Sequence, residues 1–432
     1  MTAWSLAFRN VWRNARRSVS TMLAIALSCA GLMLFGGYIT WAHLAAEVHA
    51  VVLSGHLQIF KAGYQAKGSG NPAAYALTGY DEIKKMLLGD PVIGPRIDLI
   101  TGRLVVSGIV TSAEQQTTAT FAGMGAFPGE IERIIYWNPY GLTEARHIPA
   151  NRHLFAREPE LDASDPDGIT IGEGLARVLG VNGSARPSLE LTALPPSGGL
   201  PNMVSGTVRQ TSIRAMEELD NHLVVMPIEM ASGLLFPGEP LHVTSVQLLL
   251  KSTEDLPLVE QRIDELAREH HLEWEHRDCW ELNPNHARSL SMVNMFFAFA
   301  FCIVAVVLVF TIYNTMMMGI VERTREIGAM RAMGVTRAGI VTMFVQEGIV
   351  LGLLGGCAGI VAGLVTAWAV NHSMILYTPP YFNVQAKLEV ACLHSPMIVT
   401  GSFLSSFCVA VIGALFPARR ASRLEIAEAL RH

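Results

Sequence analysis

The stretch VERTREIGAMRAMGVTRAGIV, from Val321 to Val341, contains the charged residues best placed to bind a partner. It lies between two long apolar runs. Ile327, Met330 and Met333 recur at three-residue steps, which predicts an apolar strip along a short helix. The charged residues beside or opposite that strip are Glu322, Arg323, Glu326 and Arg331. Gly334 is suited to ending the helix. Thr336 is suited to cap the next helix.

Two kinds of partner fit such a helix. An amphipathic helix at a membrane surface can bind lipid headgroups alone. Anionic lipid would repel Glu322 and Glu326, however, and their pairing with arginines favours a protein. We therefore predict that the helix presents its charges to a second protein.

The sequence lacks the motifs that carry common enzyme chemistry. The phosphate-binding loop G-x-x-x-x-G-K-[ST], the zinc motif H-E-x-x-H and the nucleophile motif G-x-S-x-G are all absent. The stretch EHHLEWEHRDC contains His270, His271, His276 and Cys279, but a helix end followed by a strand should point these side chains to different faces. We predict no catalytic residue, metal site or cofactor in this chain. The net charge of −5 gives no sign of a nucleic-acid partner.

Membrane spans are the elements that must position the charged helix. Half of the 432 residues are hydrophobic and 16% are charged, a composition more apolar than that of an ordinary soluble protein. A bilayer core of about 30 Å requires about 20 apolar residues in a helix. Runs of this kind predict four transmembrane helices, over 19–41, 292–318, 339–370 and 397–417, the last closed by Pro417.

The distribution of Lys and Arg predicts the orientation, because these residues are retained on the cytoplasmic side of nearby spans. Arginines collect before the first span, between the second and third, and after the fourth, whereas Lys387 is alone between the third and fourth. The predicted cytoplasmic segments are 1–18 (an amphipathic helix), 319–338 (the charged helix) and 418–432, and the predicted outer segments are 42–291 and 371–396. A cleaved signal sequence is the alternative at the N-terminus, but the apolar run is longer than a typical signal core.

The outer segment 42–291 has the patterns of a mixed α/β domain. HLQIF (His56 to Phe60) predicts a strand, YDEIKKMLL (Tyr80 to Leu88) a helix, and residues 243–276 a strand, helix, strand unit. LPPSGGLPNMVSG, from Leu194 to Gly206, predicts a loop. A domain interrupted by a smaller inserted subdomain fits this order.

The fold class predicted here is an α-helical membrane protein with four transmembrane helices and a large α/β extracytoplasmic domain inserted between helices 1 and 2. The segments Ala42 to Leu53 and Pro284 to Ser291 are expected to extend the first two spans as helices. Two rigid helices of this kind would form a stalk that transmits movement.

Glu347 is the ionisable candidate inside the spans. A buried ionisable residue can mark ion-coupled transport. The alternative is that Glu347 lies close enough to the interface to reach water or an arginine. Ion-coupled transport would ordinarily show several such residues, so a single candidate disfavours a secondary transporter.

Glycines in the third span recur at four-residue intervals, which places them on a helix face that a second helix can approach closely. They are Gly352, Gly355, Gly356, Gly359 and Gly363. These glycines could serve helix packing within the chain or the assembly of two subunits, and the sequence leaves both roles open. Four spans are few for a transport path, so we favour a dimer of permease subunits.

Cys279 and Cys392 are the cysteines outside the predicted spans. They could form a disulfide in an oxidising compartment, but sequence alone does not fix the pairing.

The stretches LAFRNVWRNARRS, ERTREIGAMRAMGVTRAGIVTMFVQEGIVLGLLGGCAGIVAG and PARRASRLEIAEALR together resemble the FtsX-like permease domain of the MacB/LolC/LolE group of ABC transporters. SGHLQIFKAGY and ITIGEGLARVLGV resemble pieces of the outer domain of that group. The resemblance implies a non-catalytic permease in a bacterial inner membrane, with both termini cytoplasmic and the large domain periplasmic.

The resemblance also implies partners and a mechanism. The expected partners are a dimer of ABC ATPase subunits that bind ATP and Mg, a second permease subunit of the same or a related chain, membrane lipid, and a periplasmic lipoprotein carrier. Glu322 to Gly334 would be the coupling helix, and ATP hydrolysis would move the outer domain to extract a lipoprotein or another amphiphile. MacB-like tripartite efflux and mechanotransmission to a periplasmic cell-wall enzyme are alternatives within the group. A receptor-like membrane anchor without an ATPase is the alternative outside it.

Overall fold

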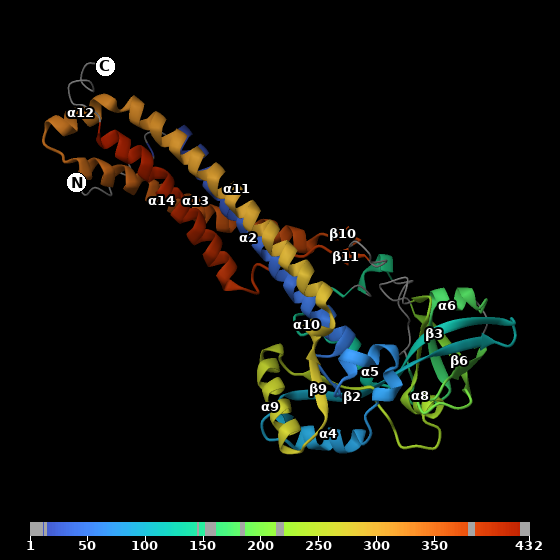
Figure 1. The fold of residues 1–432 in the computed structure, drawn as a ribbon. Coiled ribbons are helices and arrows are strands. Elements are labelled where there is room, and N and C mark those ends of the chain that lie inside the picture. The colour runs from blue at the N-terminus through green and yellow to red at the C-terminus, as the bar shows by residue number, and fades with distance from the viewer. Residues whose placement is uncertain are drawn as a thin grey trace. The chain divides into compact units, whose positions relative to one another are not determined.

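The computed structural model describes residues 12, 15–144, 147–151, 161–181, 186–212, 220–378 and 385–423 (Figure 1). The chain forms two compact units: unit 1 comprises residues up to Leu44, Arg288–Ile375 and Leu388 onward, and unit 2 comprises Ala45–Ala287 and Leu376–Lys387. Most of the amphipathic segment predicted over 1–18, and residues 424–432 of the predicted C-terminal tail, lie outside the described residues.

Unit 1 is built from long apolar helices. Four of the described helices are long and apolar enough to cross a membrane: α2 (Ala15–Ser54), α11 (Pro284–Glu322), α13 (Arg337–His372) and α14 (Pro396–Ser422). Each contains one of the predicted spans and extends beyond it at both ends. The helical extensions predicted for Ala42 to Leu53 and Pro284 to Ser291 are continuous parts of α2 and α11.

Pro417 does not close α14, contrary to the sequence prediction. The helix continues through the buried proline to Ser422. Proline removes one backbone donor, but membrane helices tolerate it where neighbouring helices cover the site. Ala414 and Ala418 flank the proline and are fully buried, so close helix packing outweighs the local preference.

The core of unit 1 combines large side chains with small ones. Ala410, Ala414 and Ala418 form a row at four-residue intervals on α14, and Ile312 of α11 and Phe344 of α13 belong to the same buried cluster. Alanines on one helix leave room for large side chains on its neighbours.

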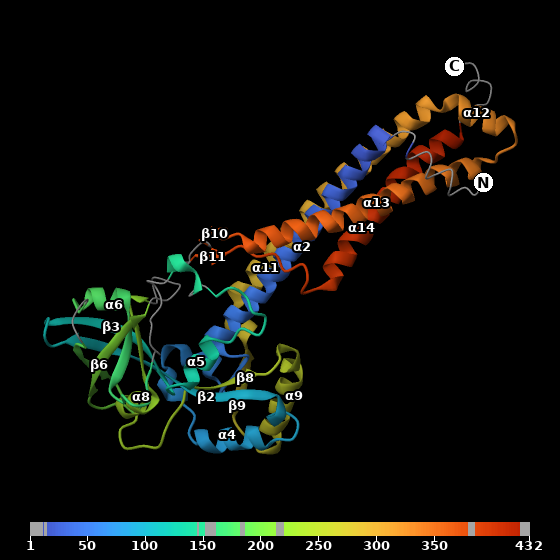
Figure 2. The ribbon, with the colours of Figure 1, turned by 180° about the vertical axis from the view of Figure 1, so that it is seen from behind.

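The described part of unit 2 is built on a sheet of nine strands in the order β3-β7-β4-β6-β5-β2-β8-β1-β9. Figure 2 shows β3 and β6 in one part of unit 2 and β8 and β9 in another. The strands are β1 (Leu57–Lys61), β2 (Ile97–Ser112), β3 (Thr117–Ala126), β4 (Gly168–Gly172), β5 (Ser188–Ala193), β6 (Asn202–Ser212), β7 (Leu223–Pro227), β8 (Ser245–Leu250) and β9 (Trp274–Asp278). Because β3 also pairs with β2, the six strands from β3 to β2 close into a ring. The strands β8, β1 and β9 extend the sheet from the first half of β2.

The strands of the ring follow one another in the chain, from β2 to β7. They all lie before β8, and the long β2 belongs to both parts of the sheet. The helices that lie within the described part of unit 2 are α3 (Tyr64–Lys67), α4 (Tyr80–Gly89), α5 (Glu130–Ile135), α6 (Glu173–Val178), α8 (Ile228–Leu235), α9 (Leu256–Glu269) and α10 (Cys279–Leu282). Short 3₁₀ turns lie at Gly68–Gly70, Pro72–Tyr75, Gly94–Arg96, Pro149–Asn151 and Thr253–Asp255.

The predicted strand, helix, strand unit over 243–276 is β8, α9 and β9. The buried residues of α9, Leu256, Val259, Ile263 and Leu266, follow helical spacing. The predicted loop over Leu194 to Gly206 is partly wrong, because β6 begins at Asn202 and pairs with β5. The Pro- and Gly-rich residues before Asn202 form the turn. The residues from Asn202 to Arg209 alternate in exposure and extend the sheet.

Candidate functional site

The predicted charged helix is present as α12 (Thr324–Ala332), between α11 and α13. Gly334 follows it with φ +95°, a left-handed conformation that favours glycine and ends the helix. The Thr336 hydroxyl accepts a hydrogen bond from the Gly339 N–H at 3.2 Å, which caps α13 as predicted.

One face of α12 packs into unit 1. Ile327 is 1% exposed and belongs to the same buried cluster as Ile320 and Ile340, and Met330 packs against that cluster. Met333, the third member of the predicted strip, is 77% exposed. The strip is therefore shorter than predicted, because the helix ends before Met333 reaches the packed face.

Polar contacts tie the α12 region to all four long helices. The Arg17 guanidinium of α2 donates to both carboxylate oxygens of Glu322, at 2.8 and 2.7 Å. Arg323 Nη1 lies 3.6 Å from Glu347 Oε2 of α13, and Arg331 Nη1 donates to the Ser422 carbonyl of α14 at 2.7 Å. These contacts join α11 to α2, the residue between α11 and α12 to α13, and α12 itself to α14.

The structure corrects the predicted role of Arg323. This residue was expected among the charges presented to a partner, but its side chain is 7% exposed and faces the Glu347 carboxylate. Glu347 thus reaches an arginine, which is one of the two environments predicted for it. An ion pair away from water requires both partners, because either charge alone would be costly to bury.

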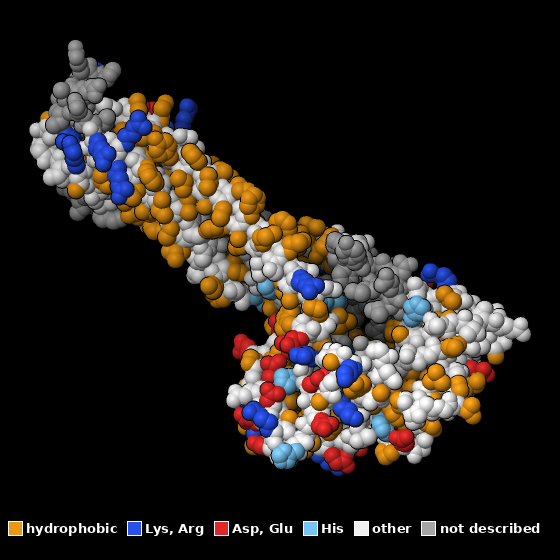
Figure 3. Space-filling model, viewed as in Figure 1, with side chains coloured by type: hydrophobic (Ala, Val, Ile, Leu, Met, Phe, Trp, Pro, Cys, Tyr) orange, Lys and Arg blue, Asp and Glu red, His pale blue; other side chains and the backbone are white. Residues whose placement is uncertain are grey.

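The outer face of α12 is open to solvent. Arg325, Glu326 and Ala329 are exposed, as are Arg337, Arg419 and Arg420 at the same ends of α13 and α14. Figure 3 shows Lys and Arg side chains gathered at this end of unit 1. A face with charges of both signs, held on a packed inner face, can bind a protein surface without deforming.

The predicted glycines lie at contacts between helices of this chain, on two faces of α13. A Cβ added at Gly355 would lie 2.8 Å from Ile25 Cβ of α2, and one at Gly359 would lie 2.6 Å from Cys29 Cβ. Gly363 faces Met33 of the same helix, and Gly352 and Gly356 face Phe407 and Phe403 of α14. These glycines therefore bring α13 close to α2 and α14, and they give no argument for a second subunit.

Sequence reasoning missed Gly348, which belongs to the face toward α14. Its added Cβ would lie 2.6 Å from Ala414 Cβ. Gly348, Gly352 and Gly356 recur at four-residue intervals, and this spacing could have identified the row.

A hydrogen-bond network fixes the end of α2 in unit 2. Leu250 N–H donates to His56 Nδ1 at 3.1 Å, so the proton of the neutral ring is on Nε2, which faces Thr253 Oγ1 at 3.1 Å. The Thr253 and Tyr140 hydroxyls both donate to Glu47 Oε1 of α2, at 2.6 Å each. The last turns of α2 are thereby attached to β8 and to the segment after α5.

Burial lowers the pKa of His56 from 6.5 to about 4. The unfolded chain therefore binds a proton below about pH 6.5 that the folded chain excludes, so the free energy of unfolding should fall as pH drops from 6.5 towards 4. The loss is roughly 1.4 kcal/mol per pH unit. In thermal unfolding of the detergent-solubilised chain at pH 7.5 and pH 5, His56→Gln should show a smaller pH dependence than the wild type. Equal dependence in both proteins would contradict this assignment.

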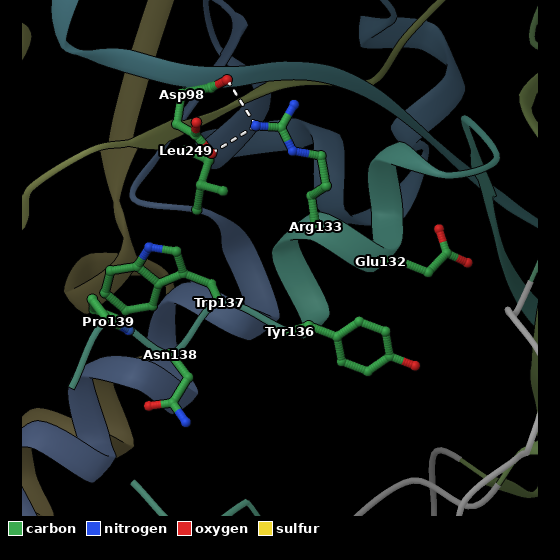
Figure 4. A pocket seen from close by; sticks show the side chains of 8 residues that line it. All are labelled: Asp98, Glu132, Arg133, Tyr136, Trp137, Asn138, Pro139 and Leu249. Atoms are coloured by element: carbon green, nitrogen blue, oxygen red, sulfur yellow. Dashed lines mark hydrogen bonds and ion pairs between the residues drawn. The ribbon is translucent and has the colours of Figure 1, made fainter. Parts of the chain in front are cut away.

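A shallow depression of about 490 Å³ lies on unit 2 beside α5 (Figure 4). Its lining residues are Asp98, Glu132, Arg133, Tyr136, Trp137, Asn138, Pro139 and Leu249. Arg133 points to Asp98 and forms an ion pair at 2.9 Å, and Trp137 lies on the other side. This lining carries no nucleophile with an adjacent base, so we assign no reaction to it.

Cys279 and Cys392 are both free thiols, so the disulfide considered from the sequence is not formed. Burial raises the pKa of Cys279 to about 12, and its side chain packs in a cluster with Ala50, Val51 and Leu249. Cys392 fills the space that the missing side chain of Gly37 leaves on α2. Both thiols serve as small packing residues.

The chain is similar to a known family over a region that includes α12, and it is similar to known proteins. Residues 298–426 match the family FtsX-like permease C-terminal. The lipoprotein-releasing system transmembrane protein LolC of Neisseria meningitidis is 25% identical over 281 residues, which cover 61% of this chain and 65% of LolC. The macrolide export ATP-binding/permease protein MacB of Pectobacterium atrosepticum is 27% identical over 194 residues, which cover 44% of this chain and 27% of MacB.

The solved extracellular domain of the ABC-type transporter YknZ from Gram-positive bacteria matches with 14% identity and a TM-score of 0.31, over 51% of this chain and 99% of that domain. The chain spans slightly less than two thirds of the length of the LolC proteins that it matches, at 64 to 65%. The FtsX-like permease domain over residues 298–426 and the similarity to LolC and MacB support an ABC transporter permease of the MacB/LolC family.

Proposed function

We propose that this chain is the non-catalytic permease subunit of an ABC transporter and that a separate ATPase drives it by displacing α12. The observation that carries this proposal is the position of α12, which is exposed on one face and is joined to the long helices by its own Arg331 and by Glu322 and Arg323 just before it. The proposed contact surface comprises Arg325, Glu326 and Ala329. Arg331 and Arg323, which lie inward, would hold α12 to the helices that it moves.

We expect α2 and α11 to carry the displacement of α12 to unit 2. α2 and α11 are unbroken helices of 40 and 39 residues that leave unit 1 and enter unit 2. Helices of this length are about 60 Å long and stiff enough to carry displacement. ATP binding and hydrolysis on a dimer of ATPase subunits, with Mg on those subunits, would thus move unit 2. This chain would need no cofactor.

We infer a bacterial inner-membrane location with both termini and α12 in the cytoplasm and unit 2 in the periplasm. The arginines around α12 and at the end of α14 support this orientation. The full assembly would contain a second permease subunit, identical or related, surrounded by membrane lipid.

We further propose that the cargo is a lipoprotein or another amphiphile released from the membrane to a periplasmic carrier. The relative named as a lipoprotein-releasing protein matches 61% of this chain, whereas three MacB proteins match 44 to 54%. The larger match favours release over efflux.

The proposed cargo can be tested with the chain, its ATPase and a fluorescent triacylated lipoprotein reconstituted in liposomes. ATP-dependent release of the lipoprotein to a soluble carrier is the expected result. ATP hydrolysis without release would contradict the proposed cargo, and it would direct attention to efflux or to mechanotransmission to a cell-wall enzyme.

A further inference from the structure

The connection between α13 and α14 belongs to both units. Leu376–Lys387 is part of unit 2, whereas the residues on either side of it are part of unit 1. β10 (Leu376–Tyr377) and β11 (Ala386–Lys387) pair antiparallel at the two ends of this segment. The chain therefore passes between the units at this connection as well as along α2 and α11.

Asn151 clamps the unit 2 part of the connection. Its Nδ2 donates to the Gln385 carbonyl at 2.8 Å, and its Oδ1 accepts a hydrogen bond from the Gln385 N–H at 3.1 Å. The residue is 1% exposed, and the neighbouring Ile148 is fully buried. A buried amide that satisfies both backbone groups of one residue holds that residue in one orientation, because leaving either group unpaired is costly.

A second asparagine clamps the unit 1 part in the same way. Asn371 at the end of α13 donates to the Val390 carbonyl at 3.0 Å and accepts from the Val390 N–H at 2.8 Å. The next residue, Ala391, donates to the Gly37 carbonyl of α2 at 3.0 Å. The connection is thus fixed at both ends, in unit 1 by Asn371 and in unit 2 by Asn151.

We propose that the β10–β11 connection is a third mechanical link between the membrane helices and unit 2, and that Asn151 is its positioning residue. The proposal rests on the function proposed above. α2 and α11 run together, with His43 hydrogen-bonded to Asn294 in unit 1 and His49 to His286 in unit 2. A unit held by one helix pair can turn about that pair. A third attachment, far away in the sequence, resists the turn, so that movement of α13 and α14 also reaches unit 2.

The clamp itself can be tested without nucleotide, in the full-length chain in detergent. Asn151→Ala should make the Gln385 amide exchange with deuterium at least about fivefold faster, because it loses its acceptor. Asn151→Asp, which keeps the size of the side chain, should loosen the contact too, because it places a carboxylate oxygen against the Gln385 carbonyl. Asn138→Ala is the matched control, since Asn138 makes the same pair of bonds to Leu142 inside one loop. Unchanged exchange at Gln385 in both Asn151 variants would overturn the clamp.

The link is tested in the complex with the ATPase. In the wild type, ATP should change deuterium exchange in peptides around residues 147–151 and 385–391. Asn151→Ala should lose at least half of this change while keeping ATPase binding, and Asn138→Ala should keep it. An equal ATP-induced change in Asn151→Ala and wild type would overturn the proposed link. Absence of any ATP-induced change in the wild type would instead count against the proposed function and leave the clamp standing.

Discussion

Replacing Gly359 by leucine should prevent the long helices of unit 1 from packing. The Cβ of the new side chain would lie 2.6 Å from Cys29 Cβ and 2.7 Å from the Ala26 carbonyl oxygen, and neither α2 atom can move aside without moving the helix. Overpacking of a close-packed site costs about 1–3 kcal/mol, and occasionally more, when side chains and backbone must shift. We expect Gly359→Leu to accumulate poorly and to elute as aggregate in size-exclusion chromatography, and Gly355→Leu to behave similarly.

Gly401→Leu in α14 is the matched control. An added Cβ at Gly401 meets no atom within 4 Å among the described residues, and the position is exposed. This variant should be produced and fold like the wild type, because leucine is well tolerated on a lipid-facing surface. Normal folding of Gly359→Leu would show that α2 and α13 do not approach as closely as described.

Removing one partner of the Arg323 and Glu347 pair should have the second large effect. Arg323→Met leaves a carboxylate that is 12% exposed without the guanidinium that faces it. Breaking a buried ion pair in this way costs about 3–5 kcal/mol. The double variant Arg323→Met with Glu347→Gln should recover most of that loss, because no charge is then left buried alone.

Thermal unfolding of the wild type, the two single variants and the double variant forms a double-mutant cycle for this pair. Additive losses would contradict the pairing. Glu347→Gln has a further use, because it distinguishes the permease from an ion-coupled transporter. ATP-dependent activity of the double variant would assign Glu347 to structure, whereas activity that runs without ATP and is lost in Glu347→Gln would favour ion coupling.

The sequence predicted the elements with strong periodic or compositional signals. The four apolar runs, α12, its terminal glycine and the Thr336 cap follow from patterns within about 20 residues of each other. The strand, helix, strand unit of β8, α9 and β9 was predictable for the same reason. Local signals of this kind depend on helix caps and apolar spacing, which act within a turn or two.

Features that depend on distant partners could not be predicted. The burial of Arg323 is decided by Glu347 on another helix, and the inward position of Arg331 is decided by the end of α14. Closure of the strand ring requires β2 to pair with both β3 and β5, and the pairing of β2 with the distant β5 cannot be read from any local pattern in the sequence. The clamp at Asn151 joins residues 234 positions apart.

The contact of Arg331 with α14 changes how the α12 surface should be probed. Glu326 and Arg331 are both charged residues of the predicted coupling helix. Arg331→Glu would also lose the bond to the Ser422 carbonyl, so its effect would combine binding with packing. Glu326 lies on the exposed face, and its reversal is the more direct probe.

The central claim is that a separate ATPase binds the exposed face of α12. The most direct measurement is an affinity pull-down of the tagged chain from mild detergent, with the ATPase activity of the bound fraction assayed. The wild type should retain an ABC ATPase, Glu326→Arg should lose at least about 90% of it while remaining folded in the membrane, and Glu273→Arg, a charge reversal on exposed unit 2 surface, should retain it. A wild-type chain that purifies without ATPase, or Glu326→Arg that retains it in full, would contradict the proposed coupling.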